Sequence, residues 1–225
     1  TDLDEGLQPW EVLVESEYSI ISAGTEGAGF SGLVKEMPFG DGGQYPRGTG
    51  YGNLGRVLKI GDEVAGLQVG DRVLSFSGHA TKVKADTRRM VMPVWQDAPG
   101  EKLVFTRMAG VSIAALRSSS VQPGDTVLVV GGGLVGNFAA QLFGLAGADV
   151  MLADLSDLRL RQAAECGIAR TVNPGRDDLV AAVEDWTGGG VRIGVEAIGI
   201  SEVIAQVVEC TARYGEVILL GSPRA

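Results

Sequence analysis

The sequence is poor in the side chains that most often bind transition metals, because its 225 residues include only two cysteines and one histidine. The cysteines, Cys166 and Cys210, fall in segments whose apolar pattern predicts helices. A disulfide framework is therefore excluded, and a reducing cytoplasm is the expected compartment. No spacing of the C-x-x-C or H-x-x-x-H kind occurs. Zinc takes three or four protein ligands from Cys, His and carboxylates, so no zinc site is expected.

An excess of basic charge is also missing. The formal net charge is −9 and the pI is about 4.7, which argues against nucleic acid or an anionic membrane as a partner. The N-terminus has no basic segment followed by an apolar core, so no secretory signal is predicted. The apolar stretch from Val127 to Ala153 is interrupted by glycines and by Asn137, Gln141 and Asp149. A strand–turn–helix–strand unit explains these breaks better than a membrane span.

The chain changes character near Gln122–Asp125, which divides it into two predicted domains, 1–118 and 119–225. In the first domain, short β-like stretches alternate with glycine turns, which indicates a small barrel-like β domain. The predicted strands are Glu11 to Glu15, Gly55 to Ile60, Asp71 to Phe76 and Thr81 to Ala85. The pattern from Glu101 to Ser119 is helical and predicts the connector into the second domain.

In the second domain, predicted strands alternate with predicted helices, which favours an α/β fold with a doubly wound parallel sheet. The predicted strands are Thr126 to Val130, Asp149 to Ala153, Arg170 to Val172, Val191 to Ala197 and Glu216 to Leu220. The predicted helices between them are Leu134 to Ala146, Ser156 to Cys166, Asp177 to Trp186 and Ser201 to Arg213. A full dinucleotide-binding domain has six strands, so a C-terminal part is expected to be missing.

A glycine-rich turn, Gly131-Gly132-Gly133-Leu134-Val135-Gly136, joins the first predicted strand of this domain to its first helix. Gly131 permits a tight turn, Gly133 lets the backbone approach a pyrophosphate, and Gly136 lets the helix pack on the strand. The amides at the helix start, including those of Leu134 and Val135, then face the diphosphate. The alternative is a glycine-rich connection that binds nothing.

An acidic residue lies where a dinucleotide-binding domain requires one. Asp154 follows Gly136 by 18 residues and ends the second predicted strand. A carboxylate here accepts the ribose hydroxyls of the adenosine and repels a 2′-phosphate, which favours NAD over NADP. The alternative role for Asp154 is a helix N-cap. Arg159 either reaches the ribose as well or is a solvated helix charge.

Together these features resemble the medium-chain dehydrogenase/reductase family, the relatives of zinc-type alcohol dehydrogenases. The resemblance rests on Gln122 to Val129, on Val195 to Gly199 and Gly215 to Gly221, and on the strand motifs Glu11 to Val14 and Gly70 to Val73. It implies a GroES-like barrel followed by a Rossmann domain, with the active site in the cleft between them. It also implies that Ala197 and Gly221 contact the cofactor, and it allows a homodimer.

The sequence departs from this family at its metal ligands. Ala23 stands where zinc-dependent members carry a cysteine, and Thr25 keeps the hydroxyl that relays protons in them. Tyr51 and Gly52 stand in place of a His-Glu pair, and no ligand occurs around Arg107. The resemblance therefore implies a member without zinc.

Without zinc, a hydrogen-bond donor must stabilise the substrate oxygen during hydride transfer. Tyr51 is the leading candidate, with Thr25 beside it in a relay. The alternatives are that Tyr51 only fills space and that Thr25 is a ribose contact or a turn hydroxyl. His79 is predicted to be structural, and Glu26 either orients a relay or caps a turn. Two arginines are expected to be surface charges or to meet an anionic substrate: Arg47 and Arg56.

The predicted function is NAD(H)-dependent interconversion of a small alcohol and a carbonyl without metal. Reduction is the easier direction, because a tyrosine that acts as an acid needs a smaller change of its pKa than one that acts as a base. One alternative is an NADPH-dependent quinone or enoyl reductase of the same family, which Asp154 disfavours. The other is a dinucleotide-binding sensor that has lost catalysis.

Overall fold

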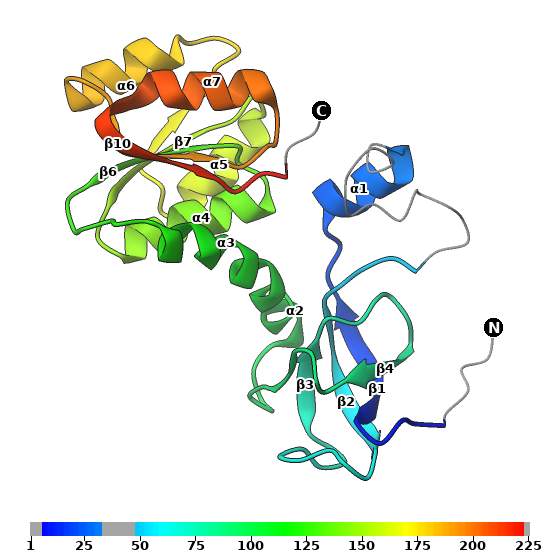
Figure 1. Cartoon of the computed structure of the whole chain (residues 1–225). Coiled ribbons are helices and arrows are strands. Elements are labelled where there is room, and N and C mark those ends of the chain that lie inside the picture. The colour runs from blue at the N-terminus through cyan, green and yellow to red at the C-terminus, as the bar shows by residue number, and fades with distance from the viewer. Residues whose placement is uncertain (1–5, 33–47, 223–225) are drawn as a thin grey trace. The chain divides into compact units, whose positions relative to one another are not determined.

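The structure, a computed structural model, describes residues 6–32 and 48–222. The chain forms two compact units, Thr1–Arg107 and Met108–Ala225 (Figure 1). The division falls near the start of helix α3 (Thr106–Ser118), within the segment that the sequence predicts as a helical connector. The short helix α2 (Gly100–Leu103) precedes it. The domain boundary expected between residues 118 and 119 stays a prediction.

The first unit is built on a five-stranded antiparallel sheet with the strand order β4-β1-β2-β3-β5. Its strands are β1 (Glu11–Ser19), β2 (Asn53–Ile60), β3 (Arg72–Ser75), β4 (Lys82–Asp86) and β5 (Val91–Pro93). The sequence predicts the first four and misses β5, which has only three residues and ends in a proline. Proline weakens a strand prediction because it donates no hydrogen bond.

Valine side chains form the core of this sheet. Val12, Val14, Val57 and Val73 are buried and pack in one cluster with Val83. In β4 the buried Val83 and Ala85 alternate with less buried residues, as expected for a strand with one face on a core. The burial of these apolar side chains is the main force that holds the strands in register.

Helix α1 (Ala23–Ser31) was not predicted, because its sequence contains three glycines and glycine disfavours helices. Its N-terminus is closed by Glu26, whose Oε1 accepts a hydrogen bond of 2.7 Å from the backbone N–H of Ser22. Its C-terminus is Gly32, at φ 80° in the left-handed region that glycine favours. Local capping thus compensates for weak helix propensity.

The second unit contains a five-stranded parallel sheet with the order β10-β9-β6-β7-β8. The strands are β6 (Thr126–Val130), β7 (Asp149–Ala153), β8 (Arg170–Val172), β9 (Val191–Glu196) and β10 (Thr211–Leu219). The helices between them are α4 (Leu134–Leu145), α5 (Asp157–Glu165), α6 (Leu179–Thr187) and α7 (Ser201–Cys210). This arrangement confirms the predicted α/β alternation.

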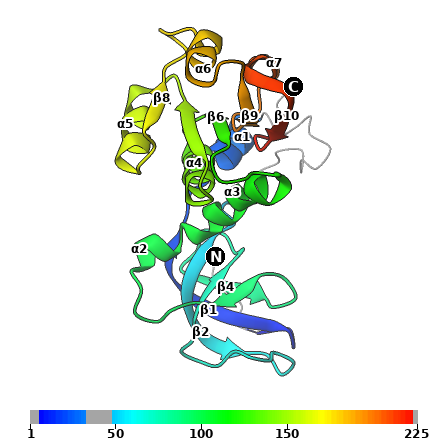
Figure 2. The ribbon, with the colours of Figure 1, turned by 90° about the vertical axis from the view of Figure 1, so that its left-hand side faces the viewer.

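Helices cover both faces of the parallel sheet. On one face, Val127 and Val129 of β6 pack in a cluster with Phe143 of α4 and Ala163 of α5. On the other face, Leu128 and Val130 pack with residues of α6 and α7. Figure 2 shows α5 beside β8 at one edge of the sheet, while β10 forms the other edge. The doubly wound arrangement is therefore confirmed.

Of the two cysteines, Cys210 lies in a helix as predicted, whereas Cys166 does not. Cys166 is exposed and directly follows α5, so placing it inside a helix was wrong by one residue; the chain turns there at Gly167, which has φ 92°. Cys210 is the buried last residue of α7, and burial raises the pKa of its thiol to about 11.

None of the described helices has the length and apolar character needed to cross a membrane.

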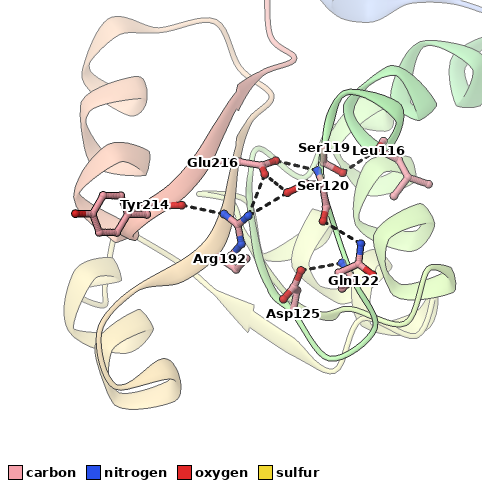
Figure 3. A network of polar contacts seen from close by, with 8 residues as sticks. All are labelled: Leu116, Ser119, Ser120, Gln122, Asp125, Arg192, Tyr214 and Glu216. Carbon is pink, nitrogen blue, oxygen red and sulfur yellow. Dashed lines mark hydrogen bonds and ion pairs between the residues drawn. The ribbon is translucent and has the colours of Figure 1, made fainter.

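A polar network ties β9 and β10 to the segment before β6 (Figure 3). The Glu216 carboxylate accepts hydrogen bonds from the backbone N–H of Ser120, at 3.0 Å, and from its hydroxyl. Arg192 lies 3.2 Å from the same carboxylate and donates to the Tyr214 carbonyl at 3.0 Å. Tyr214 has a backbone φ of 66°, which residues other than glycine rarely adopt. The hydrogen bond from Arg192 therefore helps to hold a residue with a strained backbone.

This network predicts a pH-dependent contribution to stability. The hydrogen bonds from Ser120, helped by Arg192, lower the pKa of Glu216 below its ordinary value of 4.5. The ionised Glu216 carboxylate therefore stabilises the folded chain above pH 4.5. This stabilisation is lost as the pH falls through the lowered pKa that Glu216 has in the folded chain. Glu216→Gln should cost about 1 kcal/mol at pH 7, since solvent screens the partly exposed pair. Denaturant unfolding at pH 7 and pH 3.5 checks this.

The matched control is Glu209→Gln, which removes the same charge from an exposed position on α7. The control should unfold at the wild-type denaturant concentration at both pH values. A stability loss in Glu216→Gln that persists undiminished at pH 3.5 would show that the charge of Glu216 is not the cause.

Candidate functional site

The glycine-rich turn lies between the end of β6 and the start of α4, as predicted. Gly131 has φ 108°, and a Cβ there would lie 2.7 Å from Ile198 Cγ1. A Cβ on Gly136 would lie 1.8 Å from the carbonyl oxygen of Gly131. These two glycines are therefore required by the turn itself. A Cβ on Gly133, in contrast, would meet no atom of the described residues within 4 Å, so no described part of the chain blocks the approach to its backbone.

The N-terminus of α4 is suited to an anion. Gly133 is its N-cap residue and supplies no side-chain cap, and the first turn contains no acidic residue. The first intrahelical hydrogen bond is donated by Asn137 to the Gly133 carbonyl, at 2.8 Å. The preceding amides, of Leu134, Val135 and Gly136, thus lie at the positive end of the helix dipole. Such an end with an open approach fits a phosphate group.

Asp154 is buried at the end of β7 and contacts this turn directly. Its Oδ2 accepts a hydrogen bond of 2.7 Å from the backbone N–H of Gly132 and lies 3.3 Å from Nη1 of Arg159. Its Oδ1 accepts a hydrogen bond of 2.7 Å from the backbone N–H of Ser156. Ser156, not Asp154, is the N-cap of α5. An ionised carboxylate accepts about four hydrogen bonds, so capacity for a ribose hydroxyl remains.

Ala197 lies near the glycine-rich turn, and Gly221 lies beside the Glu196–Gly199 turn that follows β9. The backbone N–H of Ala197 donates to the Val130 carbonyl at 2.9 Å, and a Cβ on Gly136 would come within 3.2 Å of the Ala197 side chain. Gly221 donates to the Glu196 carbonyl at 2.9 Å. The structure therefore places the predicted cofactor-binding residues of the second unit at the carboxyl ends of β6, β7, β9 and β10, with Arg159 on the adjoining helix α5.

A second cluster lies within the first unit and contains three hydroxyl groups. The Tyr51 hydroxyl donates to Ser22 Oγ at 2.5 Å and lies 3.5 Å from Thr25 Oγ1. Ser22 is buried, whereas Thr25 is exposed in the first turn of α1. The structure thus brings the two predicted catalytic residues together and adds Ser22, which the sequence alone did not indicate.

Arg107 is the most prominent residue of this cluster that sequence reasoning missed. Its guanidinium stacks 4.6 Å from the centre of the Tyr51 ring and 4.2 Å from that of Phe76. Its Nε donates to the Tyr51 carbonyl at 3.1 Å. Within residues 6–32 and 48–222, no carboxylate pairs with it. Burial lowers the pKa of the guanidinium, and attraction to Tyr51 opposes this shift.

Gly52 makes room for Arg107. A Cβ on Gly52 would lie 2.5 Å from Ile20 Cγ2 and 2.8 Å from Arg107 Cγ. Any side chain here would displace the arginine from the face of Tyr51. The glycine that stands where a glutamate was expected therefore has a local physical reason.

His79 and Glu26 form a separate polar chain. His79 Nε2 lies 2.9 Å from Glu26 Oε2, and His79 Nδ1 lies 2.8 Å from Ser19 Oγ. Both ring nitrogens thus have partners, as expected for a structural histidine, and Glu26 also closes α1. Among the described residues, no three His, Cys, Asp or Glu side chains are grouped to hold a metal ion. Where the structure describes the chain, the side chains that contact Tyr51 offer hydroxyls and a guanidinium, which do not fit zinc.

The two arginines that the sequence offers as anion contacts have different outcomes. Arg56 forms an ion pair of 3.0 Å with Glu17 and donates to Gln96 Oε1 at 2.9 Å. It is therefore engaged on the surface of the sheet. Arg47 lies outside the described residues.

Comparison with known proteins gives matches over most of the chain. The family described as zinc-binding dehydrogenase matches residues 135–225. (R,R)-butanediol dehydrogenase of Bacillus subtilis is 29% identical over 203 residues, which are 78% of this chain and 58% of that protein. L-threonine 3-dehydrogenase of Deinococcus radiodurans is 30% identical over 211 residues, 79% of this chain and 60% of that protein. The chain thus matches about three fifths of the length of these relatives.

The fold also matches solved structures. Escherichia coli quinone oxidoreductase, in complex with NADPH, superposes with a TM-score of 0.81 at 21% identity, covering 96% of this chain and 67% of that one. At this identity the match concerns the fold alone.

Proposed function

Because the chain belongs to the medium-chain dehydrogenase/reductase superfamily, we propose that it is part of an oxidoreductase that transfers a hydride between a nicotinamide cofactor and a small alcohol or carbonyl. The relatives named butanediol and threonine dehydrogenase support this substrate class. We propose further that the cofactor is NAD(H), that the reaction needs no metal, and that Tyr51 contacts the reacting oxygen.

The observation that carries the proposal is the cradle at the start of α4. The uncapped amides of Leu134, Val135 and Gly136 would hold the diphosphate, with Gly133 giving the approach. Asp154 would accept from the adenosine ribose while it holds Gly132 in place. When bound, the nicotinamide supplies or accepts the hydride. The chain's own contribution is to bind the dinucleotide and to handle the proton.

The preference for NAD(H) rests on the buried Asp154. A 2′-phosphate would bring a dianion next to this carboxylate, and Arg159 offsets that repulsion only in part, because its side chain is 53% exposed. We expect NADH to bind about tenfold or more tightly than NADPH, which corresponds to about 1.4 kcal/mol. In Asp154→Asn this preference should shrink, since the amide still accepts from Gly132 but carries no charge. Isothermal titration calorimetry measures both affinities.

Asp149→Asn is the matched control for this experiment. Asp149 begins the same strand β7 at its opposite end, where its side chain pairs with Arg170, so its variant should keep the wild-type cofactor preference. Tighter binding of NADPH by the wild type would favour the alternative, an NADPH-dependent quinone or enoyl reductase.

The proposed chemistry uses the hydroxyl cluster of the first unit. The Tyr51 hydroxyl would donate to the carbonyl oxygen that is being reduced, and Ser22 and Thr25 would exchange protons with it. Arg107 supplies the positive charge that stabilises the oxygen of Tyr51 when its proton leaves. The side chains at these positions supply no zinc ligand, so a hydrogen-bond donor takes the place of a Lewis acid.

Turnover of 2,3-butanediol, L-threonine and their ketone products, followed by NADH absorbance, tests the activity. Tight NADH binding without turnover of a broad alcohol and carbonyl panel would instead favour a dinucleotide-binding sensor.

A further inference from the structure

Glu196, the last residue of β9, is a buried carboxylate with an unusual distribution of hydrogen bonds. It is 0% exposed. Its Oε1 accepts from the backbone N–H groups of Ile198 and Gly199, both at 2.6 Å. Its Oε2 is shielded from solvent and has no hydrogen-bond partner among the residues that the structure describes. A Cβ on Gly221 would lie 2.7 Å from this oxygen, so a residue with a side chain at position 221 would clash with the Glu196 carboxylate.

A carboxylate is a costly way to shape a turn. A glutamine would accept the same two amide hydrogen bonds through its carbonyl oxygen and would bury no charge. No lysine, arginine or histidine pairs with Glu196 in the described parts of the chain. A buried charge without a counter-charge is strongly disfavoured unless something compensates it. The two hydrogen bonds explain the acceptor Oε1, but they leave the charge itself unexplained.

The turn that Glu196 holds is part of the candidate cofactor site. A Cβ on Gly131 would meet Ile198 at 2.7 Å and the Ala197 backbone at 3.2 Å. The turn therefore lies against the glycine-rich turn at the end of β9. Asp154 lies on the other side of β6, at the end of β7. A dinucleotide whose adenosine ribose is held at β7 crosses the sheet at the point where the strand order reverses. Its nicotinamide half then lies on the side of β9.

We infer that Glu196 is a positioning residue for the nicotinamide half of the cofactor and that its negative charge favours the oxidised ring over the reduced one. The oxidised nicotinamide carries a positive charge and the reduced ring carries none. A bound NAD⁺ would therefore supply the counter-charge that the free protein lacks. This inference rests on the proposed function, because it requires that the chain bind NAD(H).

Binding measurements without turnover test the inference. Glu196→Gln keeps the acceptor at Oε1 and removes the charge. We expect its affinity for NAD⁺ to fall about fivefold or more relative to its affinity for NADH, because a unit charge acts over several ångströms in a poorly solvated site. Its affinity for ADP-ribose, which lacks the nicotinamide ring, should stay within about twofold of the wild type. Calorimetry with the three ligands gives the ratios.

Two variants serve as controls. Glu202→Gln removes the same charge from an exposed position in the first turn of α7 and should leave all three affinities unchanged. Glu196→Asp keeps the charge, and it should retain the wild-type ratio of NAD⁺ to NADH affinity even where Glu196→Gln fails to fold.

Three outcomes would overturn the inference. The first is an unchanged ratio of NAD⁺ to NADH affinity in a folded Glu196→Gln. The second is an equal loss for NAD⁺, NADH and ADP-ribose, which would assign Glu196 a purely structural role. The third, decisive where Glu196→Gln does not fold, is loss of the NAD⁺ preference in Glu196→Asp. A wild-type chain that binds none of the three ligands would instead refute the proposed function and with it this inference.

Discussion

Gly136→Ala is expected to lower the affinity of the chain for NADH about a hundredfold or more, which corresponds to about 2.7 kcal/mol. The reason is steric, because a Cβ at this position would lie 1.8 Å from the carbonyl oxygen of Gly131. Backbone atoms cannot give way as a flexible side chain does, so the turn must move away from the start of α4. The amides of Leu134 and Val135 would then no longer point at one diphosphate. Calorimetry with NADH measures the effect.

The same helix offers a matched control. Gly144 also lies in α4, but a Cβ there would meet nothing within 4 Å. Gly144→Ala should therefore bind NADH as the wild type does, and it should be more stable by about 0.5–1 kcal/mol, since alanine favours helices. A folded Gly136→Ala that binds NADH within threefold of the wild type would mean that the glycine-rich turn does not hold the cofactor. Far-UV circular dichroism and the unfolding midpoint establish that the variants are folded.

The second half of the fold could be predicted from the sequence because its signals are local. The strands β6, β7 and β8 have the predicted bounds, since each is a short β-branched or apolar run that ends at a turn signal. The one sizeable error is at β10, which begins at Thr211 rather than Glu216. There α7 ends early, at Cys210, and the strand contains a register shift and the strained Tyr214. Tertiary contacts such as the Arg192 bond decide such a feature.

The first half was predicted less completely for the opposite reason. Helix α1 is closed by the local contact of Glu26 with the Ser22 amide, but residues far away in the sequence hold both partners: His79 contacts Glu26 and Tyr51 contacts Ser22. These distant contacts outweigh a glycine-rich sequence. The three-residue strand β5 depends on pairing with β3. Neither feature has a periodic pattern that a sequence could display.

The candidate site divides in the same way. The glycine-rich turn and Asp154 follow one another within one βαβ unit, so their spacing carries the prediction. Arg107 lies 56 residues after Tyr51 and meets it only in the folded chain. Glu196 looks like an ordinary strand end in the sequence, and only its burial and its unpartnered oxygen distinguish it. The spacing of residues in the sequence therefore identifies a local motif. Whether a charged side chain has a partner can be determined only from the folded structure.

Tyr51→Phe should lower the rate of turnover about tenfold or more, or about 1.4 kcal/mol, and leave the affinity for NADH unchanged. The substitution removes the hydroxyl that bonds Ser22 and keeps the ring against which Arg107 stacks. Steady-state kinetics with whichever of 2,3-butanediol and L-threonine the wild type oxidises faster gives kcat and KM. An unchanged kcat would remove Tyr51 from the mechanism and leave it as a side chain that fills space.

Arg107→Met should cause a loss of similar size, because it keeps much of the side-chain volume and removes the charge beside the Tyr51 ring. Arg56→Met is the matched control: Arg56 lies in the same sheet, but its partners are Glu17 and Gln96, so kcat should not change. Arg107→Lys should recover part of the activity, since it restores the charge without the planar stacking.

The double variant decides whether Arg107 acts through the hydroxyl of Tyr51. If it does, adding Arg107→Met to Tyr51→Phe should lower kcat by no more than about twofold further, because the oxygen that the charge stabilises is already gone. If the arginine only supports the fold, the two losses should multiply to about a hundredfold. Because Gly52 leaves room for the arginine and its guanidinium has no carboxylate partner in the described residues, we expect the smaller, non-additive loss.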